Sequence, residues 1–329
     1  MLGFSRQAYY QARERIEERI LHEAIILDIC QELRRKHPSL GATKMQGMVN
    51  VELATMGLDT TIGRDATYNL LREHGLLLRK TQSGRRTTNS RHSLTRHSDL
   101  YKGFVPTGIN QAWVSDITYW RIATGEHLYI HLVTDAYSRF ILGWCLSQTL
   151  HASNTIAALV MALQTLEHPI VDRLLHHSDR GSQYCSDDYV AMARQHGITM
   201  SMTQSSDPRD NAIAERVNGI LKHEYLYHYR VDSFQQARAL LRRSIHLYSY
   251  ERPHLSLNNQ TPHAVHSGTA TRSVKRLWRT SPYPFGSDPT SASHAVHSEP
   301  MTCSHADLQP SDNPNQEQST PVYLWQELH

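Results

Sequence analysis

The sequence predicts a mixed-sheet α/β domain preceded by a small helical domain. Up to about residue 80, apolar residues recur at helical spacing, as at Ile16, Ile20, Ile29 and Leu33. From Asn110 onward, three runs rich in β-branched and aromatic residues are followed by alternating helical and strand patterns. Three consecutive strands and then alternating helices and strands are typical of a mixed sheet flanked by helices. A chain of 329 residues is long enough for both domains to bury a core.

The first domain, 1–80, is expected to be a helical DNA-binding module. Residues 5–37 predict one long helix, or two, and shorter helices are expected over 42–55 and 63–74. A helix, a turn with glycine, a second helix and a basic tail resemble a helix-turn-helix module. Generic three-helix domains share this outline, so the pattern alone does not decide between them.

The second domain, 109–268, is expected to carry the sheet. Asp116 lies in an expected strand whose side chains alternate between two faces. Trp113 and Tyr119 lie on one face, and Val114, Asp116 and Trp120 lie on the other. The expected strands are 113–121, 127–134, 140–146, 173–178 and 198–202, and the expected helices are 154–166, 187–195, one from Asp210 or Asn211, and 233–250.

Positive charge is concentrated before this sheet. The net charge is +3, but residues 1–108 hold 17 basic and 11 acidic residues, a net of +6. The segment 81–108 predicts a basic linker, and we expect Lys80, Arg85 and Arg86 to contact a phosphate backbone. A merely solubilising linker explains the charge equally well. The polar segment 269–329 predicts a disordered tail.

Composition excludes several classes of protein. No apolar run approaches the roughly 20 residues that span a bilayer, and no signal-peptide core follows Met1. The cysteines are scattered, which argues against a zinc module or a disulfide framework. We therefore expect a cytoplasmic, nucleoid-associated protein.

Three acids stand out by their context. Asp116 lies in mid-strand, Asp179 ends a short strand before a tight turn, and Glu215 lies on a helix 36 positions later. A charge in mid-strand is costly unless it is paired or metal-bound. Carboxylates suit Mg²⁺, and two such ions can support phosphoryl displacement without a protein nucleophile. For any one acid alone, a surface or capping role would be the more common explanation.

Other residues have competing explanations. Glu215 and Lys222 lie two helical turns apart, on the face opposite the apolar stripe, where a solvated pair is the usual outcome. His176 and His177 could bind metal, but support of Asp179 is preferred. Asn211 is expected to cap or brace the helix. Arg252 either touches DNA phosphate or caps a helix.

The motifs together resemble a known family. Trp113-Val-Ser-Asp116, His177-Ser-Asp179-Arg-Gly-Ser-Gln-Tyr and Asp210-Asn-Ala-Ile-Ala-Glu215 with Lys222 resemble the integrase-core transposases of bacterial insertion sequences. More narrowly, the chain is similar to second-frame (OrfB) transposases of the insertion-sequence-three family, with a retroviral-integrase-like core. Tyr250-Glu-Arg252-Pro-His resembles the family's ending, except that Glu251 replaces the usual Asn. The resemblance covers about residues 1–270.

The resemblance implies a ribonuclease-H-like five-stranded sheet and a DDE transposase. Asp116, Asp179 and Glu215 would be catalytic metal ligands for Mg²⁺, with Mn²⁺ as a possible substitute, at two ions. Lys222 would contact DNA at the element end. Cleavage giving a 3′-hydroxyl and then strand transfer would follow, with the chain acting as a homo-oligomer on DNA, alone or with a first-frame (OrfA) partner.

Two further hypotheses remain open from the sequence. One is a structure-selective DNA nuclease on the same fold, which cuts without joining. The other is an inactive, DNA-binding remnant of a mobile element, although all three acids are present.

Overall fold

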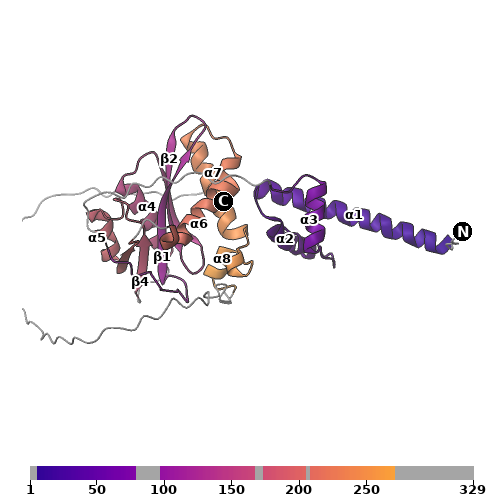
Figure 1. Cartoon of the computed structure of the whole chain (residues 1–329), viewed down its shortest axis with the longest axis horizontal. Helices are drawn as coiled ribbons and strands as arrows, with labels where there is room; N and C mark the ends of the chain where they lie inside the picture. The colour runs from indigo at the N-terminus through magenta and orange to yellow at the C-terminus, as the bar shows by residue number, and fades with distance from the viewer. Residues whose placement is uncertain (1–5, 79–96, 167–172, 205–207, 271–329) are drawn as a thin grey trace, which may run out of the picture. The chain divides into compact units, whose positions relative to one another are not determined.

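The computed structural model describes residues 6–78, 97–166, 173–204 and 208–270 (Figure 1). The sequence predictions for Lys80, Arg85 and Arg86, for most of the linker 81–108 and for nearly all of the tail 269–329 lie outside these residues. Among the described residues, no helix is both long enough and apolar enough to cross a membrane.

The first part of the chain is three helices, as predicted. They are α1 (Arg6–Lys36), α2 (Ala42–Thr55) and α3 (Arg64–Glu73), and α1 is one continuous helix. Their common core is apolar and includes Cys30, Leu33, Met45, Leu53 and Leu71, all nearly inaccessible to solvent. The buried residues of α1 all lie in its second half, so this half holds the three helices together.

The second part contains a five-stranded mixed sheet in the order β3-β2-β1-β4-β5. The strands are β1 (Ala112–Arg121), β2 (His127–Asp135), β3 (Ile141–Ser147), β4 (Leu174–Ser178) and β5 (Ile198–Met202). β1, β2 and β3 pair antiparallel, whereas β4 is parallel to both β1 and β5. This arrangement confirms the expected mixed sheet of ribonuclease-H-like type.

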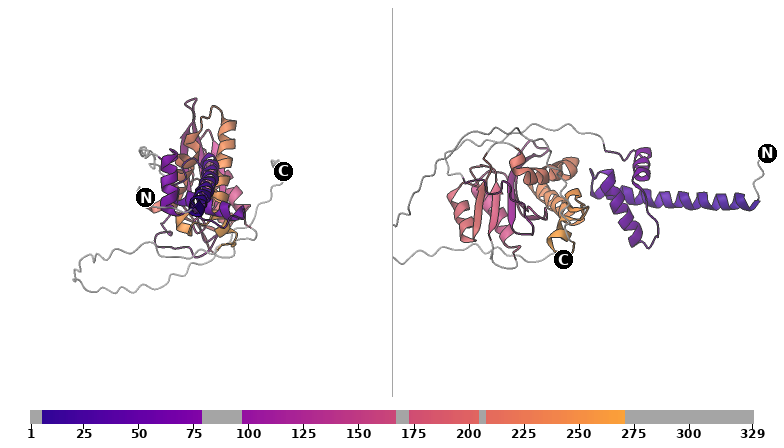
Figure 2. Two further views of the ribbon diagram at one scale, coloured as in Figure 1. Left: turned by 90° about the vertical axis from the view of Figure 1, so that its right-hand side faces the viewer. Right: turned by 60° about the horizontal axis from the view of Figure 1, so that its bottom comes forward.

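Helices cover both faces of the sheet (Figures 1 and 2). One face packs against α4 (Ala152–Leu163) and α5 (Asp187–Gln195) in a core that contains Trp113. The other packs against α6 (Ala212–Ile220) and α7 (Phe234–His246) in a core that contains Trp120. Because successive strand residues point to opposite faces, the two tryptophans of β1 serve different cores, as alternation predicts. A short helix, α8 (Pro262–His266), closes the domain.

β3 and α4 approach each other backbone to backbone at Gly143. A Cβ at this position would overlap the carbonyl oxygen of Ala158 and lie 2.7 Å from the amide nitrogen of Ala162. Only glycine fits this contact, because both neighbours are main-chain atoms that cannot rotate away.

The expected helix start is confirmed, because Asn211, one of the two residues predicted as N-cap, is the N-cap of α6. A 3-10 turn over Pro208–Asn211 precedes α6, and a π-helical turn over Leu221–Tyr225 follows it. The helix expected over 233–250 ends as α7 at His246, followed by a second π-helical turn over Leu247–Glu251. Side-chain periodicity does not distinguish a single π-helical turn from an α-helix, because the turn widens the hydrogen-bonded repeat by only one residue.

Short polar contacts join the end of α1 to the α/β domain. His37 Nδ1 is hydrogen-bonded to Tyr225 Oη at 2.9 Å, and both side chains are buried. His37 Nε2 also lies 3.6 Å from Glu251 Oε2. These contacts link the helical module to both π-helical turns.

Candidate active site

Asp116 lies near the middle of β1, the central strand of the sheet. It pairs with Leu132 of β2, and its Oδ2 accepts a 2.8 Å hydrogen bond from Nδ2 of Asn218 on α6. The residue is partly open to solvent, while protein surrounds much of its carboxyl group. A mid-strand carboxylate is thus held on the face that α6 covers.

Asp179 is brought beside Asp116 by the parallel pairing of β1 and β4. The last paired residues are Ser115 and Ser178, so the two aspartates follow at matching positions. Asp179 Oδ1 accepts the amide of Gly181 at 3.0 Å, which fixes the turn after β4. The end of β4 therefore delivers Asp179 beside the mid-strand carboxylate of Asp116.

Glu215 comes from the first turn of α6. Asn211, immediately before this helix, donates from Nδ2 to the carbonyl oxygen of Ser115 at 2.9 Å. It makes no side-chain cap bond, so of the two expected roles, the structure shows the brace. The start of α6 is thereby tied to β1 one residue before Asp116.

The three carboxylates interact electrostatically. The pKa of Asp116 is raised from 3.8 to about 7, first by burial and next by the negative charge of Asp179. Hydrogen bonds from Asn218 and from the backbone of Ile117 oppose this rise, and Glu215 adds to it. Carboxylates that raise one another's pKa form a natural site for a cation.

These acids do not form a closed metal cage. Within the described ranges, no group of three or more His, Cys, Asp or Glu side chains is arranged to hold a metal ion. The chemistry of the donors fits a hard divalent cation, but the side chains would have to approach further to share one.

Lys222 lies in the π-helical turn that follows α6, and it faces the sheet. Its Nζ donates to Thr118 Oγ1 at 3.0 Å and lies 4.8 Å from the centre of the Tyr119 ring. Burial lowers the pKa of Lys222, whereas the charge of Asp116 raises it. The expectation of a solvated face opposite the apolar stripe is wrong for this residue, because that face packs against β1.

His176 and His177 hold elements together and make no hydrogen bond to Asp179 among the contacts the structure resolves for them. His176 Nε2 is hydrogen-bonded to Ser115 Oγ at 2.8 Å and to Tyr189 Oη at 2.9 Å. His177 Nε2 donates to the carbonyl oxygen of Asp210 at 3.0 Å, and its Nδ1 bonds Ser201 Oγ at 2.9 Å. In place of the preferred direct support for Asp179, His176 braces β4 against β1 and α5, and His177 braces it against β5 and the 3-10 turn before α6.

Arg252 is not placed to contact DNA. Its side chain is 1% exposed and forms a bidentate pair with Glu224, at 2.7 Å from Nε and 2.6 Å from Nη2. The expected DNA contact is corrected to an internal ion pair that joins the two π-helical turns. The carboxylate of Glu224 accepts the hydrogen bonds of the guanidinium, which is buried away from water.

Asn218 and Thr118 were missed by sequence reasoning. Glu215, Asn218 and Lys222 are spaced by three and four residues, so helical periodicity places them on one face. Thr118 follows Asp116 by two positions and shares its face of β1. These two spacings were the available signal. They place Asn218 and Lys222 on one helix face and Asp116 and Thr118 on one strand face, and the two faces pack together.

Family models match most of this domain. Two models, each described as an integrase core domain, match residues 106–208 and 196–262. Among solved structures, the HTLV-2 integrase catalytic core domain in complex with magnesium is 18% identical, with a TM-score of 0.40, over 49% of this chain and 98% of that one. The simian T-cell lymphotropic virus intasome is 17% identical, with a TM-score of 0.43, over 77% and 81%.

Curated relatives extend the match beyond this domain. The "Insertion element IS600 uncharacterized 31 kDa protein" of Shigella sonnei is 35% identical over 269 residues, 80% of this chain and 95% of the relative. The "Transposase InsF for insertion sequence IS3A" of Escherichia coli (strain K12) is 35% identical over 158 residues, 48% of this chain and 54% of the relative. A "Putative transposase for insertion sequence element IS986/IS6110" of Mycobacterium tuberculosis is 35% identical over 169 residues, which are 50% of this chain and 60% of the relative. With an integrase core and relatives of this kind, the chain belongs to the insertion-sequence-three family of bacterial insertion-sequence transposases.

Proposed function

We propose that this transposase cuts the ends of its element to give a 3′-hydroxyl and then transfers that strand, with Asp116, Asp179 and Glu215 as the catalytic carboxylates. The observation that carries the proposal is the parallel register of Ser115 with Ser178, which brings Asp116 and Asp179 to matching positions, and the raised pKa of Asp116, with the charges of Asp179 and Glu215 among its causes, supports it. Three acids from β1, the end of β4 and α6 thus share one electrostatic environment.

The donor set supports a divalent cofactor. Carboxylate oxygens are the ligands that Mg²⁺ prefers, and Mn²⁺ accepts them as well. We propose two Mg²⁺ ions held by Asp116, Asp179 and Glu215, which when bound would activate the attacking oxygen and stabilise the leaving oxygen. Cation binding would also relieve the repulsion that raises the pKa of Asp116.

Residues around the acids would position the DNA and the carboxylates. Asn218 orients Asp116 through its 2.8 Å hydrogen bond, and Asn211 keeps the start of α6 on β1. Lys222, whose Nζ donates to Thr118 Oγ1, would pair with a phosphate near the reacting end.

Partners follow from this activity. We propose that the chain binds its element ends and target DNA as a homo-oligomer, with Lys80, Arg85 and Arg86 contributing phosphate contacts. Joining two DNA ends requires two bound ends at once, which an oligomer supplies. A first-frame partner, or a fusion to one, would add recognition of the end sequence.

The decisive experiment uses Asp179→Asn, with Asp188→Asn as the matched control. Asp188 is an exposed acid of α5, outside the three-acid site. Duplex oligonucleotides carrying the element's own ends are incubated with Mg²⁺, and gels resolve nicked from joined products. We expect the wild type and the control to cut and join, and Asp179→Asn to do neither while keeping its circular dichroism spectrum. Cutting without joining would favour the nuclease alternative, and full activity of Asp179→Asn would refute the mechanism.

A further inference from the structure

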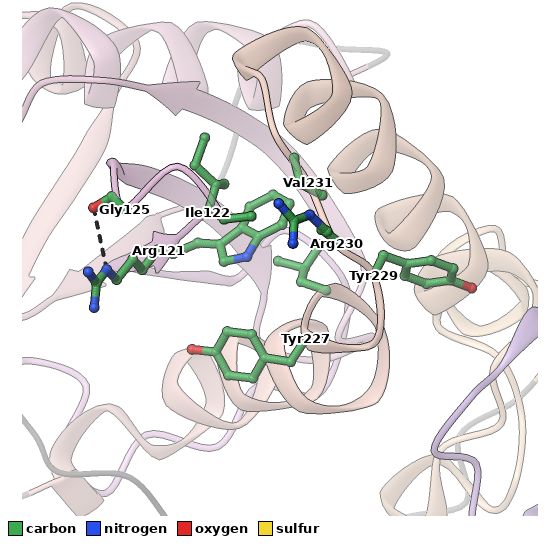
Figure 3. Close-up of a pocket in the computed structure, with 10 residues that line it drawn as sticks. Arg121, Ile122, Gly125, Tyr227, Tyr229, Arg230 and Val231 are labelled. Carbon is green, nitrogen blue, oxygen red and sulfur yellow. Dashed lines mark hydrogen bonds between the residues drawn. The ribbon is translucent and has the colours of Figure 1, made fainter.

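A surface pocket lies beyond the three-acid site, between the β1–β2 hairpin and the segment that leads into α7 (Figure 3). Its volume is about 380 Å³, the size of a site for one small-molecule-sized group. Buried Trp120, Ile122 and Val231 form its apolar lining, while Tyr227 and Arg230 contribute exposed side chains. The chemistry proposed above uses none of these five residues.

The walls of this pocket are tied together by main-chain hydrogen bonds. The amide of Ala123 in the hairpin donates to the carbonyl oxygen of Val231 at 2.8 Å, and that of Ile122 donates to Glu126 at 3.0 Å. Gly125 turns the hairpin at φ 89°, a conformation that favours glycine. The pocket is therefore preformed between two fixed segments.

Lys222 links the pocket to the strand that carries Asp116. The Lys222 Nζ lies 4.8 Å from the ring centre of Tyr119 and 5.9 Å from that of Tyr227, so one cation spans the rim of the site and the edge of the pocket. Strand β1 makes the same connection, since Asp116 and Arg121 are five residues apart, or about 17 Å along an extended strand. At about 3.4 Å per stacked nucleotide, this span corresponds to about five nucleotides.

The chemistry of the pocket matches a nucleotide. Tyr227 is half exposed and offers a ring on which any base can stack, while Arg230 offers a planar fork for a phosphate. Arg230 now pairs with Asp232 at 3.2 Å, but both side chains are largely exposed, so this pair is weak and can be exchanged. Figure 3 shows Tyr227 and Arg230 extending to the same side, toward the β1–β2 hairpin, whereas Tyr229 points the other way.

We propose that this pocket binds one nucleotide of the DNA strand that runs from the scissile phosphate past Lys222. The base stacks on Tyr227 and the phosphate pairs with Arg230, about five nucleotides from the reacting end. The proposal rests on the proposed function, because that function supplies the DNA strand at the three-acid site.

The test measures DNA binding by the full-length chain without divalent metal, so that no cleavage intervenes. The probe is a fluorescein-labelled duplex of the element's own end, and the variants are Tyr227→Ala, Tyr227→Phe and Arg230→Ala. Arg242→Ala removes an exposed arginine of α7 outside the pocket and serves as the control for loss of charge. Deoxythymidine monophosphate, added as a competitor, tests whether a free nucleotide takes the site instead.

We expect Tyr227→Ala and Arg230→Ala to raise the Kd roughly tenfold. Tyr227→Phe, which keeps the ring, and Arg242→Ala should stay within about twofold of the wild type. Arg230→Ala should also reduce the slope of log K against log salt by about 0.9, because one phosphate contact is lost. In addition, 5-iododeoxyuridine about five nucleotides from the cleavage position should crosslink to Tyr227.

Two results would overturn the proposal. One is a Kd unchanged in both alanine variants, with no crosslink to Tyr227. The other is millimolar deoxythymidine monophosphate raising the Kd of the wild type and of both alanine variants by the same factor, which would place the competition outside the pocket. End cleavage by the wild type is measured separately with Mg²⁺. If the wild type cleaves and joins while the pocket variants bind normally, the pocket proposal fails and the proposed function stands.

Discussion

At the residue scale, the hydrogen bond from Asn218 is the contact that orients Asp116. It joins α6 to β1 at 2.8 Å and favours the ionised carboxylate that a cation requires. Removing such a supporting partner of a metal ligand typically weakens metal binding 10–100-fold. We therefore predict that Asn218→Ala raises the Mg²⁺ concentration for half-maximal end cleavage by about this factor.

The measurement is a Mg²⁺ titration of cleavage at saturating DNA. Gln195→Ala, an exposed amide of α5, is the matched control and should leave the midpoint unchanged. A midpoint for Asn218→Ala equal to that of the wild type would remove Asn218 from the positioning role.

At this scale the sequence suggested the candidate acids more readily than the residues that contact them. Asp116, Asp179 and Glu215 could be chosen because their contexts are unusual and their spacing matches a family motif. Asn218 and Thr118 are ordinary residues in ordinary places, and only the packing of α6 on β1 brings them to the site. Arg252 is the opposite case. Its family motif suggested a DNA contact and gave no sign that the side chain would be buried and paired with Glu224.

At the element scale, His131 ties three elements through one buried ring. It lies on β2, and its two nitrogens are hydrogen-bonded to Thr155 of α4 at 2.9 Å and to Ser147 of β3 at 3.0 Å. Burial lowers the pKa of His131 from 6.5 to about 4. The imidazole of His131 is therefore protonated near pH 6.5 in the unfolded chain but only near pH 4 in the folded chain.

The sign of the linkage follows directly. The stabilising contribution is present above pH 6.5 and is lost as the pH falls toward 4, so the native state weakens on acidification. Between pH 7 and pH 5 the loss from His131 is about 2 kcal/mol. Urea unfolding at both pH values should show a fall in stability that is smaller by about this amount in His131→Gln, and an identical fall in both proteins would refute the assignment.

The pair between Arg252 and Glu224 joins the two π-helical turns. Removing one partner of a buried pair leaves an uncompensated charge and typically costs about 3–5 kcal/mol. We predict that Arg252→Ala lowers the free energy of unfolding by about 3 kcal/mol, because Glu224 keeps some access to water. Arg252→Met combined with Glu224→Gln should recover part of this loss in urea titrations.

DNA affinity separates this role from the one expected from the sequence. The variant that combines Arg252→Met with Glu224→Gln should bind DNA of the element's end as tightly as the wild type, because the two side chains pair with each other and neither is expected to contact DNA. If the double variant folds fully but binds DNA more weakly than the wild type, Arg252 contacts DNA, as the sequence suggested.

Elements were predicted well where periodicity is strong and less well where the backbone repeat changes. The strand positions follow from alternation and β-branched residues, and they agree with the structure within a residue or two. The π-helical turns at Leu221–Tyr225 and Leu247–Glu251 carry no sequence signature of their own. The first of them carries Lys222, which contacts β1, and Glu224, which pairs with Arg252.

At the scale of the whole described chain, His37 and Tyr225 connect the helical module to the α/β domain. Their 2.9 Å hydrogen bond lies where both side chains are buried. Tyr225→Phe leaves the nitrogen of His37 without this partner, a defect that costs about 1–3 kcal/mol. We predict roughly tenfold faster hydrogen exchange for amides of residues 33–37, while the amides of β1 keep the rate of the wild type.

Hydrogen–deuterium exchange with mass spectrometry provides this comparison. Tyr229→Phe, which removes a hydroxyl whose contact to the carbonyl oxygen of Arg35 is 3.5 Å, is the control. Equal acceleration in β1 would mean that Tyr225 stabilises the whole fold and not this connection in particular.

The backbone contact at Gly143 has a consequence for the history of the element. A copy of an insertion-sequence gene can lose function through a change in the fold as well as through a change in the three acids. A copy carrying Gly143→Ala would keep the acids, yet its new methyl group would overlap backbone atoms of α4, so that α4 and β3 would have to move apart and the protein would lose stability. Glycine at 143, which lies 27 positions after Asp116 and 36 positions before Asp179, is therefore a mark of an intact copy that inspection of the acids alone would miss.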